Sequence, residues 1–350
     1  MSDPLPRRAM DAFARVRDRL LEHRVRPLLL RARVRHVAGP ERVAYAADEV
    51  LLITIVRNGA RHLPGFLDHH FRLGVRHVVL LDNASTDDTV AIARRHPNVT
   101  VLSTSVPYAP YENVMKRYLA RRFSRGRWNL CVDIDERFDY PESAVLPLPA
   151  LVRYLDRRGY QGMVAYMLDM FADRPMDEAS VGEGQDLRRL FPMYDISAIN
   201  RRPYRFDPPA NPAIEEYHGG IRLKLFGTNN GLTKVPLVRV DDGVDLFVAW
   251  HHTRNARLAD VTGVLLHYPF DASFHEKVRD ALASRRYGQF TAQYEHYWNV
   301  LREQPDMTLV TADARRLSDI GQLVRDGFLV ESDDFRRWVD AHRQAESERA

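Results

Sequence analysis

The stretch that decides the fold is "VLLITIVRNGARHLPGFLDHHFRLGVRHVVLLD", residues 50–82. It begins with an uninterrupted apolar run at 50–56, continues with a helical pattern over 64–75, and ends with a second apolar run at 77–82. Strands that are buried on both faces of a parallel sheet carry few polar residues, and a helix usually joins two such strands. The stretch therefore predicts a strand–helix–strand unit and an α/β fold.

The same alternation continues along the chain. Further strands are predicted at 99–104 and 128–134, and further helices at 85–96 and 112–124. The helix at 85–96 is expected to begin with Ser85 as its N-cap, because two aspartates follow in the first turn. Four strands with helical crossovers indicate a mainly parallel central sheet covered by helices, in which ligands bind beyond the carboxyl ends of the strands.

The second half of the chain has a less regular pattern. A helix at 149–158 and a strand at 162–170 continue the alternation, and the Pro-, Asp- and Arg-rich segment 171–219 is predicted to form long surface connections. Strands are predicted at 220–226 and 261–268, and helices from there to the end of the chain. The prediction is thus an α/β domain with helical N- and C-terminal extensions.

These changes of pattern divide the 350 residues into four segments. A chain of this length that is 45% hydrophobic can bury a full core. The predicted segments are a basic helical N-terminal extension (1–46), a first half of the domain (47–170), a second half (171–270) and C-terminal helices (271–350).

The charge composition favours an anionic small ligand over a nucleic acid. The formal net charge is only +4, with 47 acids distributed among 51 basic residues. Only four of those 51 are lysines, and this bias toward arginine is typical of a bacterial protein from a GC-rich genome.

The sequence also predicts where the protein acts. It has no apolar run near the about 18 residues of a membrane span and no signal peptide, so a cytoplasmic location is expected. The segment 1–46 holds eleven arginines and five acids. It is expected to be a helix packed on the flank of the domain or a loose arm, and the alternative is a basic amphipathic helix in contact with the inner face of the membrane.

Acids follow the predicted fourth strand in "RWNLCVDIDERFDYP", residues 127–141. Crowded carboxylates repel one another, so a cation is expected nearby. If the strand continues through Asp133 and Asp135, both side chains face the same side and Glu136 faces away. Two carboxylates with an open approach suit Mg²⁺ or Mn²⁺ and leave ligand positions for phosphate oxygens. The alternative is a strand end whose acids face water.

Glycine-rich phosphate loops are absent from the sequence. No GxGxxG follows the strand at 50–56, and no GxxxxGK[ST] occurs anywhere. A nucleotide bound to this sheet must therefore have its phosphate charge balanced in another way, for which a metal on an Asp-x-Asp pair is one solution.

Three motifs together resemble a known family. They are "VRN" at the end of the first strand, "LLDNASTDDT" after the second and "DIDE" after the fourth. They resemble the nucleotide-binding half of family 2-like glycosyltransferases with the GT-A fold, in particular the subgroup related to family 92. The later stretches "HGGIRLKLFG", "LTKVPLV" and "GVLLHYPF" also resemble that subgroup, so the likeness covers roughly residues 48–300.

The resemblance implies roles for individual residues. Val56, Arg57, Asn58, Asp82 and Asn83 would bind the nucleotide sugar, with Asp82 accepting a hydrogen bond from the base. Asp133 would contact the ribose or the metal, Asp135 would ligate the metal, and His267 would complete the metal shell. Structural alternatives are that Asp82 caps its loop and that His267 is only hydrogen-bonded.

The resemblance also implies a reaction. A metal-dependent glycosyltransferase moves a sugar from a nucleoside-diphosphate sugar to an acceptor hydroxyl, with inversion expected for this family. Residues 47–170 would bind the nucleotide sugar and Mn²⁺ or Mg²⁺, and 171–270 would bind the acceptor, whether a glycan, a lipid-linked glycan or a small molecule. A carboxylate must take the acceptor proton, and the candidates are Asp169, Glu215 and Glu216.

Other classes fit the motifs less well. A HAD-type phosphatase places its Asp-x-Asp after the first strand, and a nucleotidyltransferase usually has a glycine-rich basic loop there. A nucleotide-sugar binding module without catalysis, or a peripheral-membrane scaffold, would share parts of the pattern. The binding module would keep Asp82 and the Asp-x-Asp pair and show no sugar transfer, and the scaffold would show lipid binding that survives Asp135→Ala.

Overall fold

The computed structural model describes most of the chain. The described residues are 21–182, 185–248, 252–284, 291–304 and 306–348.

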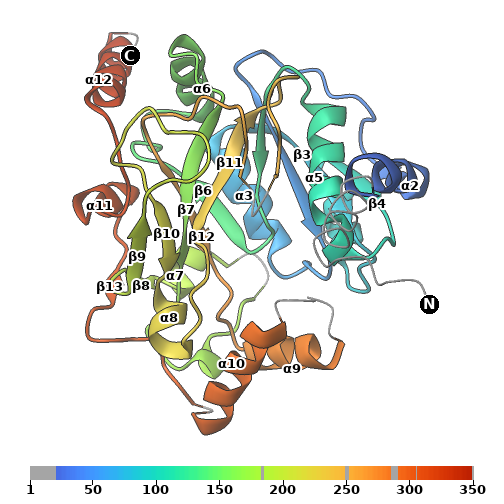
Figure 1. Cartoon of the computed structure of the whole chain (residues 1–350), viewed down its shortest axis with the longest axis vertical. Coiled ribbons are helices and arrows are strands. Elements are labelled where there is room, and N and C mark those ends of the chain that lie inside the picture. The colour runs from blue at the N-terminus through green and yellow to red at the C-terminus, as the bar shows by residue number, and fades with distance from the viewer. Residues whose placement is uncertain (1–20, 183–184, 249–251, 285–290, 305, 349–350) are drawn as a thin grey trace, which may run out of the picture.

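A nine-stranded sheet forms the centre of the described structure, in the order β1-β4-β3-β2-β5-β11-β7-β12-β6 (Figure 1). Six strands run in one direction and three in the other. The six are β2 (Val50–Val56), β3 (Val75–Asp82), β4 (Val99–Ser103), β5 (Trp128–Cys131), β7 (Gly162–Asp169) and β12 (Gly263–His267), and the three are β1 (Arg35–Ala38), β6 (Glu136–Asp139) and β11 (Thr233–Arg239).

Helices cover both faces of this sheet. The chain passes from β2 through β3 to β4 in one direction and then returns past β2 to β5, so right-handed crossovers place α3 (Leu63–Leu73) and α4 (Thr89–Ala93) on one face and α5 (Tyr108–Phe123) on the other. In agreement, α3 packs on β3 and on α4, and α5 packs on β2. The predicted mainly parallel sheet covered by helices is confirmed.

The remaining elements surround this core. Before the sheet lie a π-helical turn η1 (Leu21–Val25) and α2 (Arg26–Arg33), and α6 (Leu148–Arg157) precedes β7. Between β7 and β11 lie η2 (Met176–Glu178), α7 (Leu187–Leu190), β8 (Met193–Tyr194), β9 (Ile199–Arg202), β10 (Glu216–Gly219) and α8 (Ile221–Phe226). After β12 follow α9 (Phe274–Ser284), α10 (Thr291–Glu303), β13 (Arg315–Arg316), α11 (Ile320–Arg325) and α12 (Asp333–Ser347).

Two aromatic-rich cores hold these parts together. The main core fills the space between the sheet and its helices. A second core contains Phe226, Phe270, Phe274 and Tyr297 and packs α9 and α10 against α8. In Figure 1 this helix pair lies beneath the lower end of the sheet, where it can form the wall of a site at the strand ends.

Three of the predicted elements are wrong or misplaced. Residues 221–226 form helix α8 and no strand, because the chain reverses at Gly219 and Gly220, whose φ angles are 90° and 67° and favour glycine. The helix expected at 85–96 is restricted to α4, and Ser85 does not cap it. The fourth strand ends at Cys131, so Asp133 and Asp135 lie in the following turn and strand alternation does not orient them.

The strands β1, β6 and β11 were not predicted. Strand β11 lies in the middle of the sheet and contains Pro236, which lacks an N–H and argues against a central strand. The pairing of β11 with β7 shifts register between Lys234 and Leu237, which accommodates the proline. The segment 171–219 also contains short elements and is more ordered than long surface connections.

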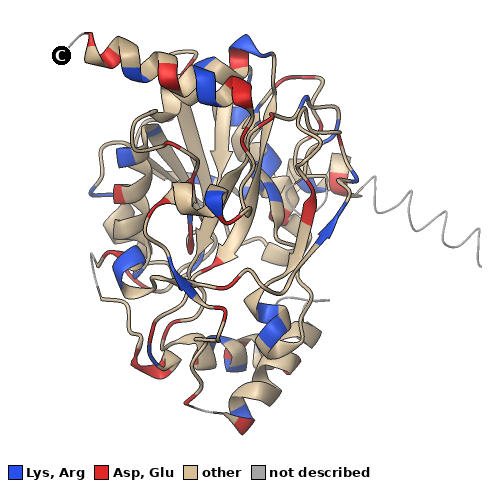
Figure 2. Cartoon of the chain, turned by 90° about the vertical axis from the view of Figure 1, so that its left-hand side faces the viewer, with Lys and Arg blue, Asp and Glu red and all other residues tan. Residues whose placement is uncertain are grey.

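No helix in the described ranges is long and apolar enough to cross a membrane. Figure 2 shows acidic and basic residues mixed along α12, the helix next to the C-terminus. The predicted N-terminal helix is present as α2, whereas residues 1–20 of that prediction lie outside the described residues.

Candidate functional site

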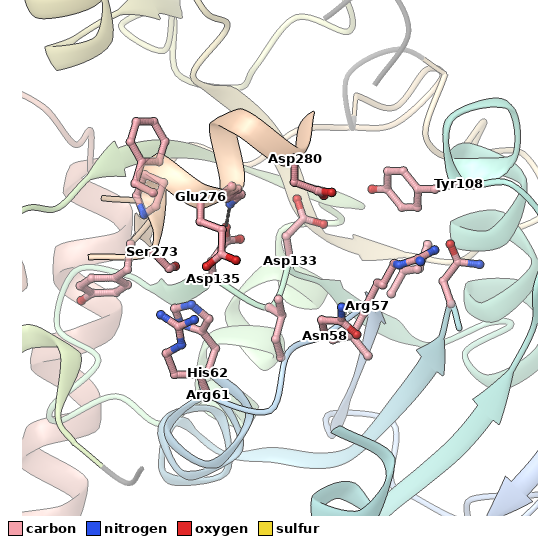
Figure 3. A pocket seen from close by; sticks show the side chains of 18 of the residues that line it. Arg57, Asn58, Arg61, His62, Tyr108, Asp133, Asp135, Ser273, Glu276 and Asp280 are labelled. Atoms are coloured by element: carbon pink, nitrogen blue, oxygen red, sulfur yellow. Dashed lines mark hydrogen bonds and ion pairs between the residues drawn. The ribbon is translucent and has the colours of Figure 1, made fainter. Parts of the chain in front are cut away.

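A cavity of about 1210 Å³ lies at the carboxyl ends of β2 and β5. These two strands flank the point at which the strand order reverses, where ligands bind in open α/β sheets. The residues that follow β2 and β5 form one wall, and α9, α10 and the start of α5 form the other walls. Figure 3 shows the polar side chains that enter the cavity from these elements.

The loop after β2 brings three of the predicted residues to the cavity. Val56, Arg57 and Asn58 all line it. Asn58 has a left-handed backbone with φ of 53°, a conformation that asparagine tolerates better than most residues. Its side-chain oxygen accepts a hydrogen bond from the Thr86 N–H at 2.8 Å, and its own N–H donates to Ser85 Oγ at 2.9 Å. Asn58 therefore ties the loop after β2 to the loop after β3.

The loop after β3 separates the two residues predicted there. Asn83 lines the cavity, and its amide donates hydrogen bonds to the carbonyls of Thr104 and Val106. Asp82 is buried, is not among the cavity-lining residues, and accepts a hydrogen bond from the Ser85 N–H at 3.1 Å. Asp82 in this structure thus shapes the loop that carries Asn83.

Asp133 belongs to a buried group of charges, which we call the lysine cluster: Lys116, Asp133, Glu136 and Lys234. The Lys234 Nζ lies 3.0 Å from Asp133 and 2.6 Å from Glu136, and the Lys116 Nζ lies 3.6 Å from Asp133. Glu136 also accepts a hydrogen bond from the Asp133 N–H at 3.2 Å, so it does not face away as predicted. Two of the four lysines of the chain supply the positive charge that the acidic stretch required.

The pKa values in the lysine cluster follow from this pairing. Burial opposes the charged form of both lysines, but the Asp133 carboxylate, together with Glu112 at Lys116 and Glu136 at Lys234, outweighs burial and raises the pKa of each. Both lysines therefore remain charged at neutral pH. The Asp133 carboxylate faces the cavity with two cations beside it.

Asp135 belongs to a second group, which we call the histidine cluster: Asp135, Asp169, Arg222 and His267. The Asp135 carboxylate lies 3.4 Å from His267 Nε2, and His267 Nδ1 lies 2.6 Å from Asp169. Arg222 holds both oxygens of Asp169 through its Nε and Nη2, at 2.8 and 2.7 Å. Such a bidentate pair is among the stronger charge-assisted interactions in proteins.

The histidine cluster fixes the orientation of the His267 ring. Burial would raise the pKa of Asp169, but Arg222 outweighs burial and lowers it to about 2. Asp169 is therefore ionised and can accept a hydrogen bond from His267 Nδ1, which also lies 2.8 Å from Arg222 Nη2. Burial opposes protonation of His267, but Asp135 and Asp169 outweigh burial and raise its pKa. When the ring is neutral, its Nε2 lone pair is directed toward Asp135.

These residues fit a divalent metal with two protein ligands. A carboxylate and an imidazole whose second nitrogen is bound by another carboxylate form a common metal-binding arrangement. Asp135 and His267 supply the ligands and Asp169 the second carboxylate. Within the described ranges no three His, Cys, Asp or Glu side chains converge as a ligand group. Asp133 is paired with lysines, so further ligands would have to come from a substrate.

The three acids predicted as candidate bases do not line the cavity. Asp169 is buried behind His267. Glu216 is also buried, and its carboxylate accepts hydrogen bonds from Arg205 Nε at 2.7 Å and from the Arg205 N–H at 3.1 Å. Glu215 is half-buried, and its backbone carbonyl accepts a hydrogen bond from Tyr166 at 3.0 Å.

The sequence reasoning did not identify the acids of helix α9. Glu276 and Asp280 are exposed, line the cavity, and lie four residues apart on the same helix face. In the view of Figure 3, Glu276 lies beside Asp135, and Asp280 lies above Asp133. Their helical spacing directly after the strand that ends at His267 is a signal that could have pointed to them.

Basic side chains also enter the cavity. Arg57, Arg61, Arg222 and Lys277 line it, and the Lys277 Nζ lies 3.5 Å from the Asp135 carboxylate. Arg61 pairs with Asp271 at 2.9 Å. The cavity thus offers several cations close to the candidate metal ligands.

Comparison of the sequence with known proteins gives partial matches among solved structures. No protein-family model and no curated protein matches it. Mannosyltransferase PcManGT from Pyrobaculum calidifontis in complex with GDP-Man and Mn²⁺ is 21% identical over 46% of this chain and 46% of that chain, with a TM-score of 0.26. The 4-diphosphocytidyl-2C-methyl-D-erythritol synthase from Anaerococcus prevotii is 15% identical over 40% of this chain and 66% of that chain, with a TM-score of 0.24. UTP-bound UGPase from Acinetobacter baumannii is 9% identical over 73% of this chain and 83% of that chain, with a TM-score of 0.26.

The chain thus spans less than half of the length of the mannosyltransferase. With TM-scores of 0.26 or less and identities of 21% or less, these matches assign neither a family nor a substrate to this chain.

Proposed function

We propose that this protein is a metal-dependent glycosyltransferase of the GT-A type that moves a sugar from a nucleoside-diphosphate sugar to an acceptor hydroxyl. The observation that carries the proposal is the pairing of Asp135 with His267 at the carboxyl ends of the strands, with Asp169 behind the histidine. The motifs that resemble the subgroup related to family 92 include Asp135 and His267, and they agree with this assignment.

In this proposal Asp135 and His267 hold the metal. The imidazole ligand favours Mn²⁺ over Mg²⁺, which prefers oxygen ligands alone. When bound, the ion offsets the charge that develops on the diphosphate leaving group. Lys277 and Arg57 line the same cavity, and their charges would bind the phosphate oxygens. Asp169 acts as a positioning residue that keeps His267 Nε2 available. This role takes the place of the role of catalytic base that the sequence suggested for Asp169.

The nucleoside would occupy the side of the cavity formed by the loops after β2 and β3. Val56, Asn58 and Asn83 line this side, and Tyr108 closes it from the start of α5. The Asp133 carboxylate, which lies beside its two lysines, would accept hydrogen bonds from the ribose hydroxyls. Asp82 would act indirectly, through the loop geometry that it stabilises.

The acceptor would enter from the side of α9 and α10. Glu276 lies near Asp135 on this wall in Figure 3, and we assign it as the base that takes the proton of the attacking hydroxyl. Inversion of the sugar, which the family resemblance implies, requires this base to act from the side of the sugar away from the leaving group. Under this proposal residues 47–170 supply the donor side, and the acceptor side includes α9 in addition to 171–270.

Calorimetric titration tests the donor site. Nucleoside diphosphates and their sugars are titrated with and without Mn²⁺ into wild type, Asp135→Ala and the control Asp242→Ala, which removes an exposed acid outside the cavity. We expect Mn²⁺-dependent binding of one nucleotide in wild type and the control, and its loss in Asp135→Ala. Absence of nucleotide binding under every condition would overturn the proposal.

Activity assays then separate the alternatives. With the nucleotide identified, sugar transfer or slow hydrolysis of the donor indicates a glycosyltransferase, whereas pyrophosphate release from a nucleoside triphosphate and a sugar phosphate indicates a nucleotidyltransferase. Binding with neither reaction would identify a non-catalytic module. Loss of turnover with retained donor binding in Glu276→Gln supports its assignment as the base.

A further inference from the structure

The outer face of helix α2 is unusually apolar for a solvent-exposed surface. Five large hydrophobic side chains in the described part of the chain are exposed, and three of them lie within five residues. These three are Val25, Leu28 and Leu29, which are 38%, 70% and 47% exposed, and the other two are Val145 and Val310. Scattered exposed apolar residues are ordinary, but a contiguous group of them marks an interaction surface.

The spacing of these residues places them on one side of the helix. Val25, Leu28 and Leu29 follow the i, i+3, i+4 pattern of neighbours on a helix face. Leu30 points the opposite way, since it is fully buried in the main core. Helix α2 thus has one apolar side against the protein and a second apolar side toward solvent.

Positive charges border the exposed apolar side. Arg24 and Arg31 lie on one flank and Arg33 on the other, and all three are exposed. The segment 23–36 contains five arginines and no acid. Long arginine side chains next to leucines can extend toward headgroup phosphates while the leucines enter the apolar layer.

The rest of the molecule holds this face in place. Arg26 lies over the Tyr111 ring of α5, 5.8 Å from its centre, and Glu22 pairs with Arg117 of α5 at 2.7 Å. The residues Tyr108, Ala109 and Pro110 at the start of α5 line the cavity. Figure 1 shows α2 at the outer edge of the molecule beside α5, the helix whose first residues line the cavity.

We propose that the exposed face of α2 docks this protein on an anionic lipid bilayer. Val25, Leu28 and Leu29 would enter the boundary of the acyl chains, and the flanking arginines would bind headgroup phosphates. A bilayer is favoured over a protein partner because, in the described part of the chain, arginines flank the patch on both sides and the nearby Glu22 is engaged by Arg117, which matches a surface of uniform negative charge.

Docking through α2 would bring the cavity close to the membrane surface, and this consequence concerns the acceptor. It rests on the proposed function: if the chain is a glycosyltransferase, its acceptor is an amphiphile held in the same membrane, such as a lipid-linked sugar. The docking itself does not depend on the transfer reaction.

Vesicle co-sedimentation of the full chain tests the proposal. The vesicles consist of phosphatidylcholine alone or mixed with phosphatidylglycerol, and the variants are Leu28→Ser/Leu29→Ser and Arg31→Gln/Arg33→Gln. The matched controls Val145→Ser and Val310→Ser remove the other exposed apolar residues. We expect binding of wild type and both controls to the anionic vesicles only. The arginine double variant should bind at least tenfold more weakly, since each arginine near such a surface contributes about 1 kcal/mol. The leucine double variant should also bind at least tenfold more weakly, because its serines no longer enter the apolar layer.

Three outcomes would overturn the proposal. One is the absence of wild-type binding to anionic vesicles, and another is equal binding by Leu28→Ser/Leu29→Ser. The third is a concentration-dependent dimer that this variant loses, which would show that a second copy covers the face. Donor binding is measured in parallel: a failure of nucleotide binding with intact vesicle binding refutes the proposed function alone, and the converse refutes docking alone.

Discussion

Asp133 of the lysine cluster and Asp135 of the histidine cluster are only two residues apart in the chain, yet the two clusters differ in the groups that balance their acids. In the lysine cluster, Lys234 pairs with Asp133 and Glu136, and Lys116 lies between Asp133 and Glu112, so the acids are balanced by fixed cations. In the histidine cluster, Arg222 is committed to Asp169, and Asp135 lies 3.4 Å from His267 Nε2 and 3.5 Å from the Lys277 Nζ. Histidine can lose its proton near neutral pH and then bind a metal, whereas a paired lysine stays charged.

This difference separates two roles within one acidic motif. Asp133 is neutralised by the protein itself, and removing a cation from its cluster would leave a buried charge without a partner. Asp135 lies beside Lys277 and also beside His267, an imidazole that can exchange its proton for a metal. An Asp-x-Asp motif therefore does not by itself say that both carboxylates bind the ion, because the answer depends on which side chains the fold places beside each one.

The largest expected effect distinguishes the two aspartates directly. Asp135→Asn should lower the rate of Mn²⁺-dependent sugar transfer about 1000-fold, because a metal at the leaving group contributes several kcal/mol to stabilising the transition state. Asp133→Asn should lower it about tenfold, as expected for the loss of one hydrogen-bond acceptor to the ribose. Initial rates at saturating Mn²⁺ measure both, and equal losses would remove the distinction between the clusters.

Removal of a lysine should affect stability more than binding. Lys234→Met leaves the buried carboxylate of Glu136 without its 2.6 Å partner, which should lower the free energy of unfolding by about 3–5 kcal/mol. Urea denaturation measures the loss, and the double variant Lys234→Met/Glu136→Gln should recover part of it. A loss below about 1 kcal/mol would show that this ion pair contributes little to the fold.

The positioning role of Asp169 predicts a smaller effect on the metal. Asp169→Asn weakens the bond that orients His267, and changes of this kind typically lower metal affinity about 10–100-fold. Calorimetric titration with Mn²⁺ measures the change, and circular dichroism checks that the variant is folded. Unchanged affinity would show that His267 needs no support from Asp169.

The smallest effect concerns a third charged group outside the cavity, Asp195 with Lys224 at 2.8 Å. Burial would raise the pKa of Asp195, but its hydrogen bonds to Lys224, Thr311 and Ser197 outweigh burial and lower it from 3.8 to about 2. The pair therefore stabilises the fold above pH 3.8, and this contribution disappears as the pH falls toward 2.

Acid denaturation of Asp195→Asn tests this prediction. The variant should lose less stability than wild type between pH 4 and 2, and its nucleotide binding at neutral pH should be unchanged. A change in nucleotide binding would mean that lysine pairing outside the cavity also influences the site, and the contrast between the two clusters would then be less sharp.

The sequence predicted the parallel part of the sheet well and the rest poorly. The apolar runs at 50–56, 77–82 and 99–104 correspond closely to β2, β3 and β4, because strands buried on both faces must be apolar along their whole length. Strand β11 was missed because Pro236 and Lys234 interrupt its apolar pattern. The run at 221–226 is apolar enough to form a strand or a helix. It forms helix α8 because the chain reverses at the two glycines that precede it.

The candidate site was predictable only where its residues adjoin the predicted strands. Val56, Arg57, Asn58, Asn83, Asp133, Asp135 and His267 all line the cavity, as their positions at strand ends suggested. Glu215 and Glu216 were chosen from their order along the chain, which says nothing about the direction of a side chain. The acids of α9 reach the cavity because the second core packs that helix against α8.

By itself the sequence determined that a mainly parallel sheet forms and that Asp133 and Asp135 follow one of its strands, because apolar periodicity and residue order are local properties. Only the tertiary structure decided which partner each acid receives. His267 lies 98 residues from Asp169 along the chain, and Lys234 lies 101 residues from Asp133. Contacts over such separations depend on the order of the strands in the sheet, and the charge and the chemistry of each carboxylate depend on those contacts.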